Sequence, residues 1–477
     1  MKPWRSFIFF LIIFLLIGTI SFFSDKGTIT IFNSFKLSFP YLIPQETVED
    51  IPQSPSQPIE DVDTVIILAE PPSDTLVLQP TTKPSTVDTN LVKLEFAEEH
   101  ADSTYFTFLQ HKLATANEKP VHILYYGDSQ LEGDRITFTL RKAFQQRYGG
   151  NGIGLIPLKH TYNSTHGFNL TVSPNWKGSV IYDKDVNYKD FGLMCQYVSL
   201  GDTSSTDHHT DQAWVRIRKL KRNKGGNNDF TRLGLFYTSP DSNAVASFIF
   251  KDTVAFQFNL KHTKDIQLTK FSFQNSPQLF KMLFDTRNRL NIHGFFMEGP
   301  SGVYVDNIPL RGCVYPKLSA IDQTDLQFML NKLNVGAVIM HFGVNLVPDI
   351  RKNYNLYTIA LKREIHTIRK HLPDVPIIIV SVSDMARKSG NNYQSYPNIQ
   401  LIKEAQKIAA FDTKCAFWDL EKTMGGKNSM IKWVKNSPPL GNKDYIHFSQ
   451  RGADSIGTML YSSIKQRLDW ESKTMKR

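Results

Sequence analysis

The sequence predicts an α/β domain that is interrupted by an all-β insertion. Two patterns of apolar and polar residues along the chain support this prediction. In residues 92–160 and 304–477, short apolar runs alternate with helical patterns, which is typical of a parallel sheet with helices on both faces. In residues 161–303, short runs alternate between apolar and polar residues, which is typical of an antiparallel β-sandwich.

Three apolar runs in the α/β regions have the length of buried strands. They are VHILYYG (residues 121–127), VGAVIMHFG (335–343) and PIIIVSVSD (376–384). Two segments between or after them have the apolar spacing of amphipathic helices, namely ITFTLRKAFQQRYG (136–149) and LYTIALKREIHTIRKHL (356–372). These segments are the elements on which the predicted α/β sheet depends.

The run VAFQFNL (254–260) shows the alternation expected of the insertion. Four apolar side chains are expected on one of its faces: Val254, Phe256, Phe258 and Leu260. Turn-forming clusters such as NKGGNN and SPDSN separate such runs, so the insertion is predicted to be an antiparallel sandwich.

A chain of 477 residues is long enough for two folded units and connecting segments. Its 41% hydrophobic, 21% charged and 12% aromatic residues exclude global disorder, a collagen-like sequence and a polytopic membrane protein. The net charge of +10 suits anionic surroundings such as phospholipid head groups or wall polymers. Nucleic acid is disfavoured, because no recognised binding motif is present and export is expected.

The cysteines show no metal-ligand spacing; they are Cys195, Cys313 and Cys415. Buried structural thiols are favoured over one disulfide and a free thiol. The Asp207-His208-His209 sequence offers metal ligands, but adjacent histidines on a strand face opposite sides, so a polar loop is favoured. We expect neither a metal nor an organic cofactor.

The N-terminus has the pattern of an export segment. Lys2 and Arg5 precede an apolar run at residues 7–23, which is long enough to span a bilayer as a short helix. A retained anchor (residues 1–25) is favoured over a cleaved signal peptide, because no clear cleavage pattern follows. Residues 26–91 are rich in Pro, Ser and Thr and are expected to form a disordered linker. The predicted location is the bacterial inner membrane, with a single-pass helix and the folded domains in the periplasm.

Ser129 lies where the apolar run 121–127 meets a helical pattern. In open α/β sheets, ligands bind at the carboxyl ends of strands, where helix N-termini present backbone N–H groups. A nucleophile and a simple helix N-cap are equally favoured by this position alone.

Asp444 and His447 lie three residues apart before a second helical pattern that starts near Ser449. A carboxylate at this spacing can orient an imidazole that accepts a serine proton. An isolated pair of this kind is more often an incidental acid beside a loop histidine.

Four motifs occur in the order found in SGNH hydrolases, a superfamily that the chain resembles. They are Gly127-Asp128-Ser129, Gly312, Gly343-Val344-Asn345 and Asp444-x-x-His447. The resemblance implies a flavodoxin-like three-layer domain with Ser129 as nucleophile, His447 as general base and acid, and Asp444 as its orienting group. It also implies an oxyanion hole formed by the backbone N–H groups of Ser129 and Gly312 and the side-chain amide of Asn345.

The sequence departs from the SGNH pattern at two positions without losing a catalytic group. Gln130 replaces a leucine, and Leu346 replaces the aspartate that often follows the third-block asparagine. The assignment of Gly312 competes with that of Gly302.

A narrower resemblance is to cell-envelope enzymes that act on O-acetyl groups of peptidoglycan or related glycans. It rests on the segments GDSQLEGDRIT, GGNGIGLIPL, CAFWDLEKTMGG and PPLGNKDYIHFSQRGAD, and on the inserted β domain. In peptidoglycan O-acetylesterases, a carbohydrate-binding-like β domain occupies such an insertion. The resemblance therefore implies an acetylated glycan as substrate.

The predicted function is that of a serine esterase that removes O-acetyl groups from such a glycan. The alternative is an O-acyltransferase that uses the same triad to acetylate a wall or capsule polysaccharide, with a membrane-bound acyl-transfer partner. A lipase or thioesterase and a glycan-binding module with a decayed site are weaker alternatives.

Two further features of the sequence could contact a ligand or be structural. A basic run (residues 216–224) is more often solvated than bound to an anionic surface. Four tryptophans could stack on sugars or lie in the core: Trp176, Trp214, Trp418 and Trp433.

Overall fold

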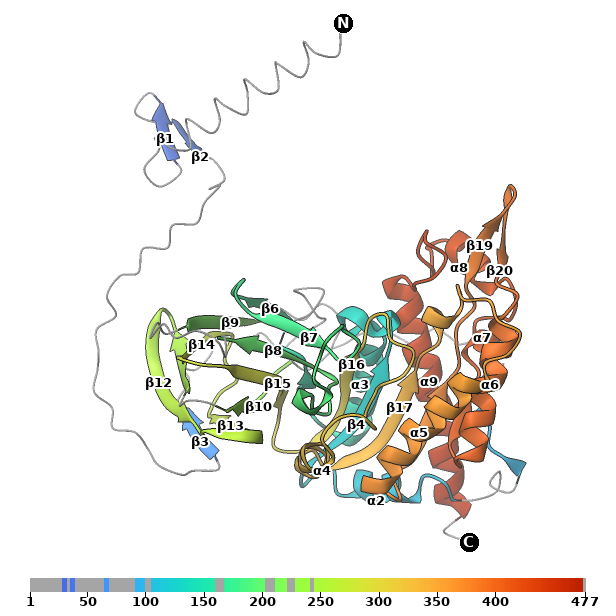
Figure 1. Ribbon diagram of the computed structural model, residues 1–477, viewed down its shortest axis with the longest axis horizontal. Helices are drawn as coiled ribbons and strands as arrows, with labels where there is room; N and C mark the ends of the chain where they lie inside the picture. Colours follow the sequence, from blue (N-terminus) through green and yellow to red (C-terminus); the bar gives the residue numbers. More distant parts are fainter. Residues whose placement is uncertain are drawn as a thin grey trace, which may run out of the picture. The chain divides into compact units, whose positions relative to one another are not determined.

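A parallel sheet forms the centre of the α/β region in the computed structural model (Figure 1). In the described part of the chain, its strands lie in the order β16-β4-β17-β18-β21. The strands are β4 (Pro120–Gly127), β16 (Gly302–Pro309), β17 (Val335–His341), β18 (Ile377–Val380) and β21 (Ala416–Trp418). All four ladders are parallel, and numbered along the chain the order is 2-1-3-4-5, as in flavodoxin-like sheets. The three predicted strands are β4, β17 and β18.

The structure describes residues 91–98, 104–158, 167–201, 211–220, 228–240 and 244–474, and the strand backbones of β1 (Thr28–Ile31), β2 (Phe35–Ser38) and β3 (Thr64–Ile67). Residues 1–57 and 58–477 form two separate units. The first contains the antiparallel pair β1–β2.

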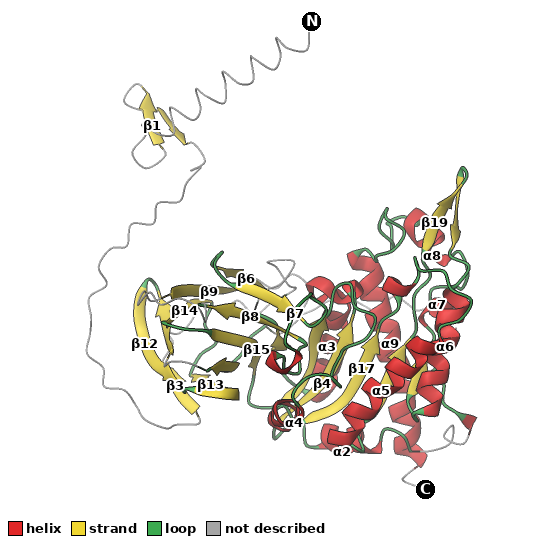
Figure 2. Ribbon diagram, in the orientation of Figure 1, coloured by secondary structure: helices red, strands yellow, loops and turns green. Residues whose placement is uncertain are grey.

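Helices cover both faces of the parallel sheet (Figure 2). One face packs against α2 (Thr107–Ala114), α3 (Arg135–Tyr148), α8 (Ser429–Lys435) and α9 (Gln450–Thr474). The other face packs against α4 (Gln323–Lys332), α5 (Asn355–His371) and α6 (Ile399–Asp412).

Neighbouring strand residues alternate between the two helical layers. Tyr125 and Ile339 join the first core, whereas Tyr126 and Met340 join the second. Both predicted helices, now α3 and α5, are confirmed within one residue at each end.

Two further sheets pack face to face as a sandwich. Within the described residues, one sheet has the order β3-β13-β10-β15-β8-β7, with β5 also paired to β15, and the other has the order β12-β11-β14-β9-β6. The bounds of these strands are β5 (Gly152–Ile156), β6 (Phe168–Val172), β7 (Lys177–Val180), β8 (Gln196–Leu200), β9 (Asp211–Lys219), β10 (Arg232–Ser239), β11 (Ala244–Phe250), β12 (Thr253–Leu260), β13 (Thr263–Phe273), β14 (Leu279–Thr286) and β15 (Leu290–Glu298). The rings of Phe248 and Phe271 meet between the sheets at 4.8 Å.

The alternation expected in β12 holds for three of its four apolar residues. Leu260 is buried and Phe256 and Phe258 are partly buried, but Val254 is 38% exposed. The ladder to β11 shifts register between Val254 and Phe256, and this irregularity turns the start of the strand outward.

The sandwich also contains strands from outside residues 161–303, the predicted insertion. Strand β5 precedes residue 161 but pairs antiparallel with β15, and β3 from the predicted linker pairs with β13. The remaining residues between 26 and 90, apart from β1 and β2, lie outside the described ranges.

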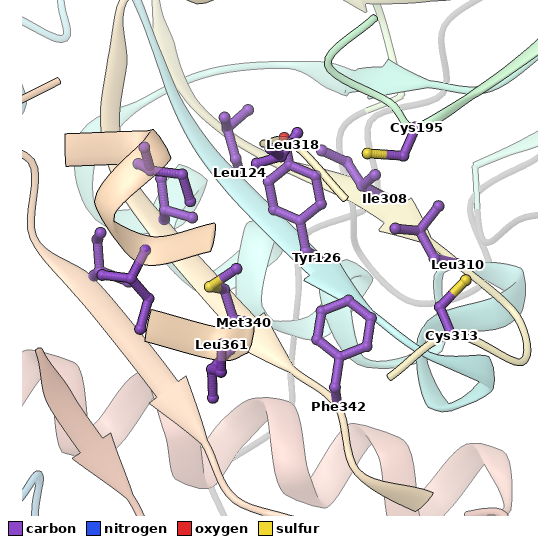
Figure 3. Close-up of a cluster of buried hydrophobic side chains, with 14 of the residues drawn as sticks. Leu124, Tyr126, Cys195, Ile308, Leu310, Cys313, Leu318, Met340, Phe342 and Leu361 are labelled. Carbon is purple, nitrogen blue, oxygen red and sulfur yellow. The ribbon is translucent and has the colours of Figure 1, made fainter. Parts of the chain in front are cut away.

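One apolar core joins the parallel sheet to the insertion (Figure 3). Tyr126 and Met340 contribute from the sheet, Ile308 from its edge strand, and Cys195 from the insertion. The three cysteines are buried and free, which confirms the prediction of structural thiols.

Among the described residues, no helix combines the length and the apolar character needed to cross a membrane. The predicted anchor, residues 1–25, lies outside the described ranges.

Candidate active site

Ser129 follows the carboxyl end of β4 and opens a 3₁₀ turn, η3 (Ser129–Asp134). The cap of this turn is Asp128, whose carboxylate accepts the backbone N–H of Gln130 at 3.1 Å, so Ser129 is not the N-cap. The expectation that a helix begins at once is corrected, because the left-handed backbone of Gly133 (φ 71°) separates η3 from α3. The serine hydroxyl is thereby free for another partner.

That partner is His447, which lies 318 residues further along the chain. Ser129 Oγ and His447 Nε2 are 2.7 Å apart. On the other side of the ring, Nδ1 of His447 lies 2.8 Å from Oδ2 of Asp444. The three predicted residues therefore form a continuous hydrogen-bonded chain from carboxylate to imidazole to hydroxyl.

Asp444 is held by the backbone of its own loop. Its Oδ1 accepts the backbone N–H groups of Ile446 at 2.9 Å and His447 at 3.0 Å. Burial would raise the pKa of this carboxyl, but the hydrogen bonds from the His447 ring and from the two N–H groups lower it below the usual value. Asp444 therefore stays ionised at neutral pH and favours the Nδ1–H tautomer of His447.

The second and third blocks meet beside the serine turn at the carboxyl edge of the sheet. The backbone N–H of Leu310 donates to Gly127 O at 2.7 Å. Asn345 lies in the turn η5 (Val344–Leu346) after β17, and its amide donates to the carbonyl of Cys313 at 2.8 Å. Asn345 therefore touches the residue that follows Gly312.

Gly312 is favoured over Gly302 as an oxyanion donor by its place in the sheet. Gly302 pairs with Pro120, the first residue of β4, and so lies at the amino edge, away from Ser129. Gly312 follows the carboxyl end of β16 and has a left-handed backbone (φ 77°). Among the described residues, its backbone N–H and that of Ser129 make no hydrogen bond to another backbone group. The three proposed donors thus come from turns that lie at one edge.

Asp128 ties the serine turn to the third block. Besides Gln130, it accepts the backbone N–H of Val344 at 3.3 Å. Burial raises the pKa of this carboxyl to about 7, although the backbone N–H groups that it accepts act in the opposite direction. The residue is therefore a buried acceptor that holds two loops together.

Two residues that sequence reasoning did not assign join the serine turn to the His447 loop. Gln130 donates to Ile446 O at 2.8 Å and accepts the N–H of Phe448 at 3.3 Å. Its amide is therefore hydrogen-bonded to the residues on both sides of His447. Arg135 donates to Ser129 O at 2.8 Å and to Phe448 O at 2.9 Å. The signal in the sequence was the departure at position 130, where an amide replaces an apolar residue inside the first block.

Apart from Leu346, which follows Asn345 in η5, the remaining predicted features lie away from this edge or outside the described residues. Leu346 is partly buried in η5. Asp207, His208 and His209 lie outside the described ranges, and within those ranges no cluster of three His, Cys, Asp or Glu side chains is arranged to hold a metal ion.

Three of the four tryptophans are core residues: Trp176, Trp418 and Trp433. Trp214 on β9 is partly buried beneath the cations of Arg216 and Lys281, at 5.7 and 5.2 Å from its ring centre. Both cations come from the insertion, so Trp214 is already paired there.

The sequence matches no protein-family model and no curated protein. Among solved structures, the chain is similar to a peptidoglycan O-acetylesterase, with 18% identity and a TM-score of 0.61, over 78% of this chain and 98% of that one. Two other similarities have low TM-scores. A salicylyl-acyltransferase from a tetracycline biosynthetic pathway has 11% identity and a TM-score of 0.27, over 62% of this chain and 98% of that one. A family two carbohydrate esterase mutant from Clostridium thermocellum has 11% identity and a TM-score of 0.25, over 62% of this chain and 100% of that one. The chain therefore has the fold of the peptidoglycan O-acetylesterase structure, in keeping with its resemblance to the SGNH hydrolases.

Proposed function

We propose that this protein is a serine esterase that removes O-acetyl groups from peptidoglycan or a related cell-envelope glycan. One observation carries the proposal. The Asp444 carboxylate, the His447 ring and the Ser129 hydroxyl form a single chain with contacts of 2.8 and 2.7 Å. This geometry lets an otherwise weak serine nucleophile lose its proton as it attacks an ester.

In the first step, Ser129 Oγ attacks the acetyl carbonyl while His447 Nε2 takes the hydroxyl proton. The negative charge on the carbonyl oxygen is stabilised by the N–H groups of Ser129 and Gly312 and by the amide of Asn345. The C–O bond to the sugar then breaks, and His447 returns the proton to the departing sugar oxygen. The product is acetyl-Ser129 and a free sugar hydroxyl.

In the second step, water attacks acetyl-Ser129 while His447 accepts one of its protons. Collapse of the second tetrahedral intermediate releases acetate and restores the Ser129 hydroxyl with the proton from His447. Asp444 stabilises the imidazolium in both steps and does not itself exchange a proton.

The glycan substrate is supported by the fold shared with a peptidoglycan O-acetylesterase and by the motifs quoted above. The net charge of +10 suits a polyanionic wall polymer. The N-terminal apolar run supports an inner-membrane anchor that keeps the catalytic part in the periplasm, beside the glycan.

The decisive experiment supplies O-acetylated peptidoglycan to the full chain and quantifies free acetate and acetyl groups transferred to added muropeptide. The parent is expected to release acetate, and Ser129→Ala to release at least about 10³-fold less. Equal release by the two proteins would refute the mechanism. Acetyl transfer in place of acetate release would instead favour the O-acyltransferase alternative. An unchanged thermal unfolding midpoint of Ser129→Ala shows that the variant is folded.

A further inference from the structure

A small hairpin projects from the α/β region (Figure 1). It is formed by β19 (Ala386–Ser389) and β20 (Asn392–Ser395), joined by a two-residue turn in which Gly390 has a positive φ of 59°. A lone two-stranded hairpin is only marginally stable in water. Its position therefore depends on contacts with the rest of the chain.

The base of the hairpin is fixed by buried polar groups. The hydroxyl of Ser395 donates to Asp384 Oδ1 at 2.6 Å, and the other carboxylate oxygen of Asp384 accepts the N–H of Met430 at 2.8 Å. Asn428 exchanges two hydrogen bonds with Ser395, at 2.7 and 2.9 Å. The hairpin is thus anchored to the start of α8 and has a defined direction.

The hairpin contacts the catalytic loop at Tyr445, the residue after Asp444. The rings of Tyr393 and Tyr445 are stacked, with centroids 3.7 Å apart and planes at 14°. In addition, the N–H of Ala386 donates to Tyr445 O at 3.1 Å. These two contacts hold both the side chain and the backbone of Tyr445.

Tyr445 has a conformation that needs such support. Its φ is 59°, in the left-handed region that a bulky residue adopts only when its surroundings impose it. This backbone turn lets Asp444 accept the N–H groups of Ile446 and His447 while its second oxygen meets the His447 ring. The geometry of the acid and base pair is therefore linked to the conformation of Tyr445.

We propose that the β19–β20 hairpin is a positioning element of the active site and that Tyr393 is its positioning residue. Tyr393 holds Tyr445, and through it the loop of residues 444–447, in the arrangement that places His447 Nε2 against Ser129. The loop is then held from two sides, by Gln130 and Arg135 from the serine turn and by the hairpin at Tyr445. This inference rests on the proposed role of Ser129 and His447, and assigns to the hairpin a role in turnover and not in substrate binding.

The test compares Tyr393→Ala, Tyr393→Leu and Tyr393→Phe in the full chain with 4-nitrophenyl acetate as substrate. We expect kcat to fall about tenfold or more in the alanine variant, because small misplacements of catalytic groups slow turnover strongly, while KM stays within about twofold. Tyr393→Phe keeps the ring stack and should retain the parent kcat. Tyr393→Leu keeps bulk without a ring, should lie between them, and serves if the alanine variant does not fold. Trp470→Ala, at an aromatic residue of nearly equal exposure on α9 (39% against 40%), should match the parent.

A second readout does not depend on activity. Hydrogen exchange of the amides in residues 442–448 is expected to quicken in Tyr393→Ala and to stay at the parent rate in Tyr393→Phe. The inference is overturned if exchange of this segment is unchanged, or if kcat is unchanged in Tyr393→Ala, or if only KM rises. Failure of the proposed function has a different signature, because Ser129→Ala would then keep the parent activity whatever the exchange rates show.

Discussion

Asn345 is held in place by a hydrogen bond of its side-chain amide. One N–H of its amide donates to Cys313 O, which fixes the amide beside Gly312, and the second N–H is the one that we propose as a donor to the oxyanion. Asn345→Ala is expected to lower kcat by roughly 10² to 10³-fold with little change in KM, because the donor acts in the transition state. Steady-state kinetics with 4-nitrophenyl acetate measures this. Leu346→Ala, at the adjacent partly buried position, is the control, and a kcat of Asn345→Ala equal to that of Leu346→Ala would remove Asn345 from the oxyanion hole.

The hydrogen-bond partners of Gln130 could not be predicted from the sequence around it. Its identity was visible in the sequence as a departure from the family pattern, but its partners, Ile446 and Phe448, lie more than 310 residues away. An amide can both donate and accept, and the fully buried Gln130 uses both capacities on the two sides of His447. No local pattern contains that pairing, because it depends on how β4 and the loop before α9 meet.

At the scale of elements, His122 ties the catalytic sheet to the sandwich. Its Nδ1 lies 2.9 Å from Asp306 Oδ2 on β16, and its Nε2 lies 3.1 Å from Glu298 Oε2 on β15. Burial alone would lower the pKa of His122, but the two carboxylates outweigh burial and raise the pKa to about 10. A buried imidazolium thus bridges three strands, one of which leads to Ser129.

The ion pairs of His122 with Asp306 and Glu298 predict that the free energy of unfolding depends on pH. The folded-state pKa of His122 lies above its unfolded value near 6.5, so its stabilising contribution is complete below about pH 6.5 and is lost as pH rises through about 10. His122→Phe leaves two buried carboxylates without their cation, so it should cost roughly 3 to 5 kcal/mol of unfolding free energy at pH 6. The difference from the parent should shrink between pH 7 and 10.5.

Urea unfolding across this pH range measures the effect. His111→Phe, at an exposed histidine in the last turn of α2, is the matched control and should follow the parent at every pH. A difference between His122→Phe and the parent that is constant with pH would show that the bridge carries no net charge interaction.

At the scale of the whole molecule, the sandwich and the α/β layers share a core. Cys195 from the insertion packs in the same cluster as Cys415, which lies just before β21. Because the cluster is continuous, we expect the two regions to unfold together, although proteins with two domains often unfold in steps. The two buried free thiols offer one reporter for each region.

Pulse labelling of thiols in increasing urea, resolved for each cysteine by mass spectrometry, should give Cys195 and Cys415 the same midpoint. Protection of Cys415 at urea concentrations where Cys195 is fully labelled would mean that the insertion opens independently. Either thiol reacts only after exposure, because burial raises the pKa of both and keeps them protonated.

Three strands and two helices of the α/β region, the sandwich pattern of the insertion and the choice of Ser129, Asp444 and His447 as candidate catalytic residues could be predicted from the sequence. Apolar patterning is a local property. It was confirmed in β4 and β17, whose apolar runs are buried on both faces, and in α3 and α5, which bury the face that their apolar spacing marks. The candidate triad was identified from short motifs and their order along the chain, and both can be read directly from the sequence.

Tertiary structure distinguishes the two glycines, because Gly302 lies at the amino edge of the sheet and Gly312 lies at the carboxyl edge, as Ser129 does. It also recruited β5 into the sandwich, and it brought Gln130 and Tyr393 to the histidine loop. These contacts join residues far apart in sequence. Their formation depends on loop closure and on the packing of whole layers, and no local pattern of residues encodes either.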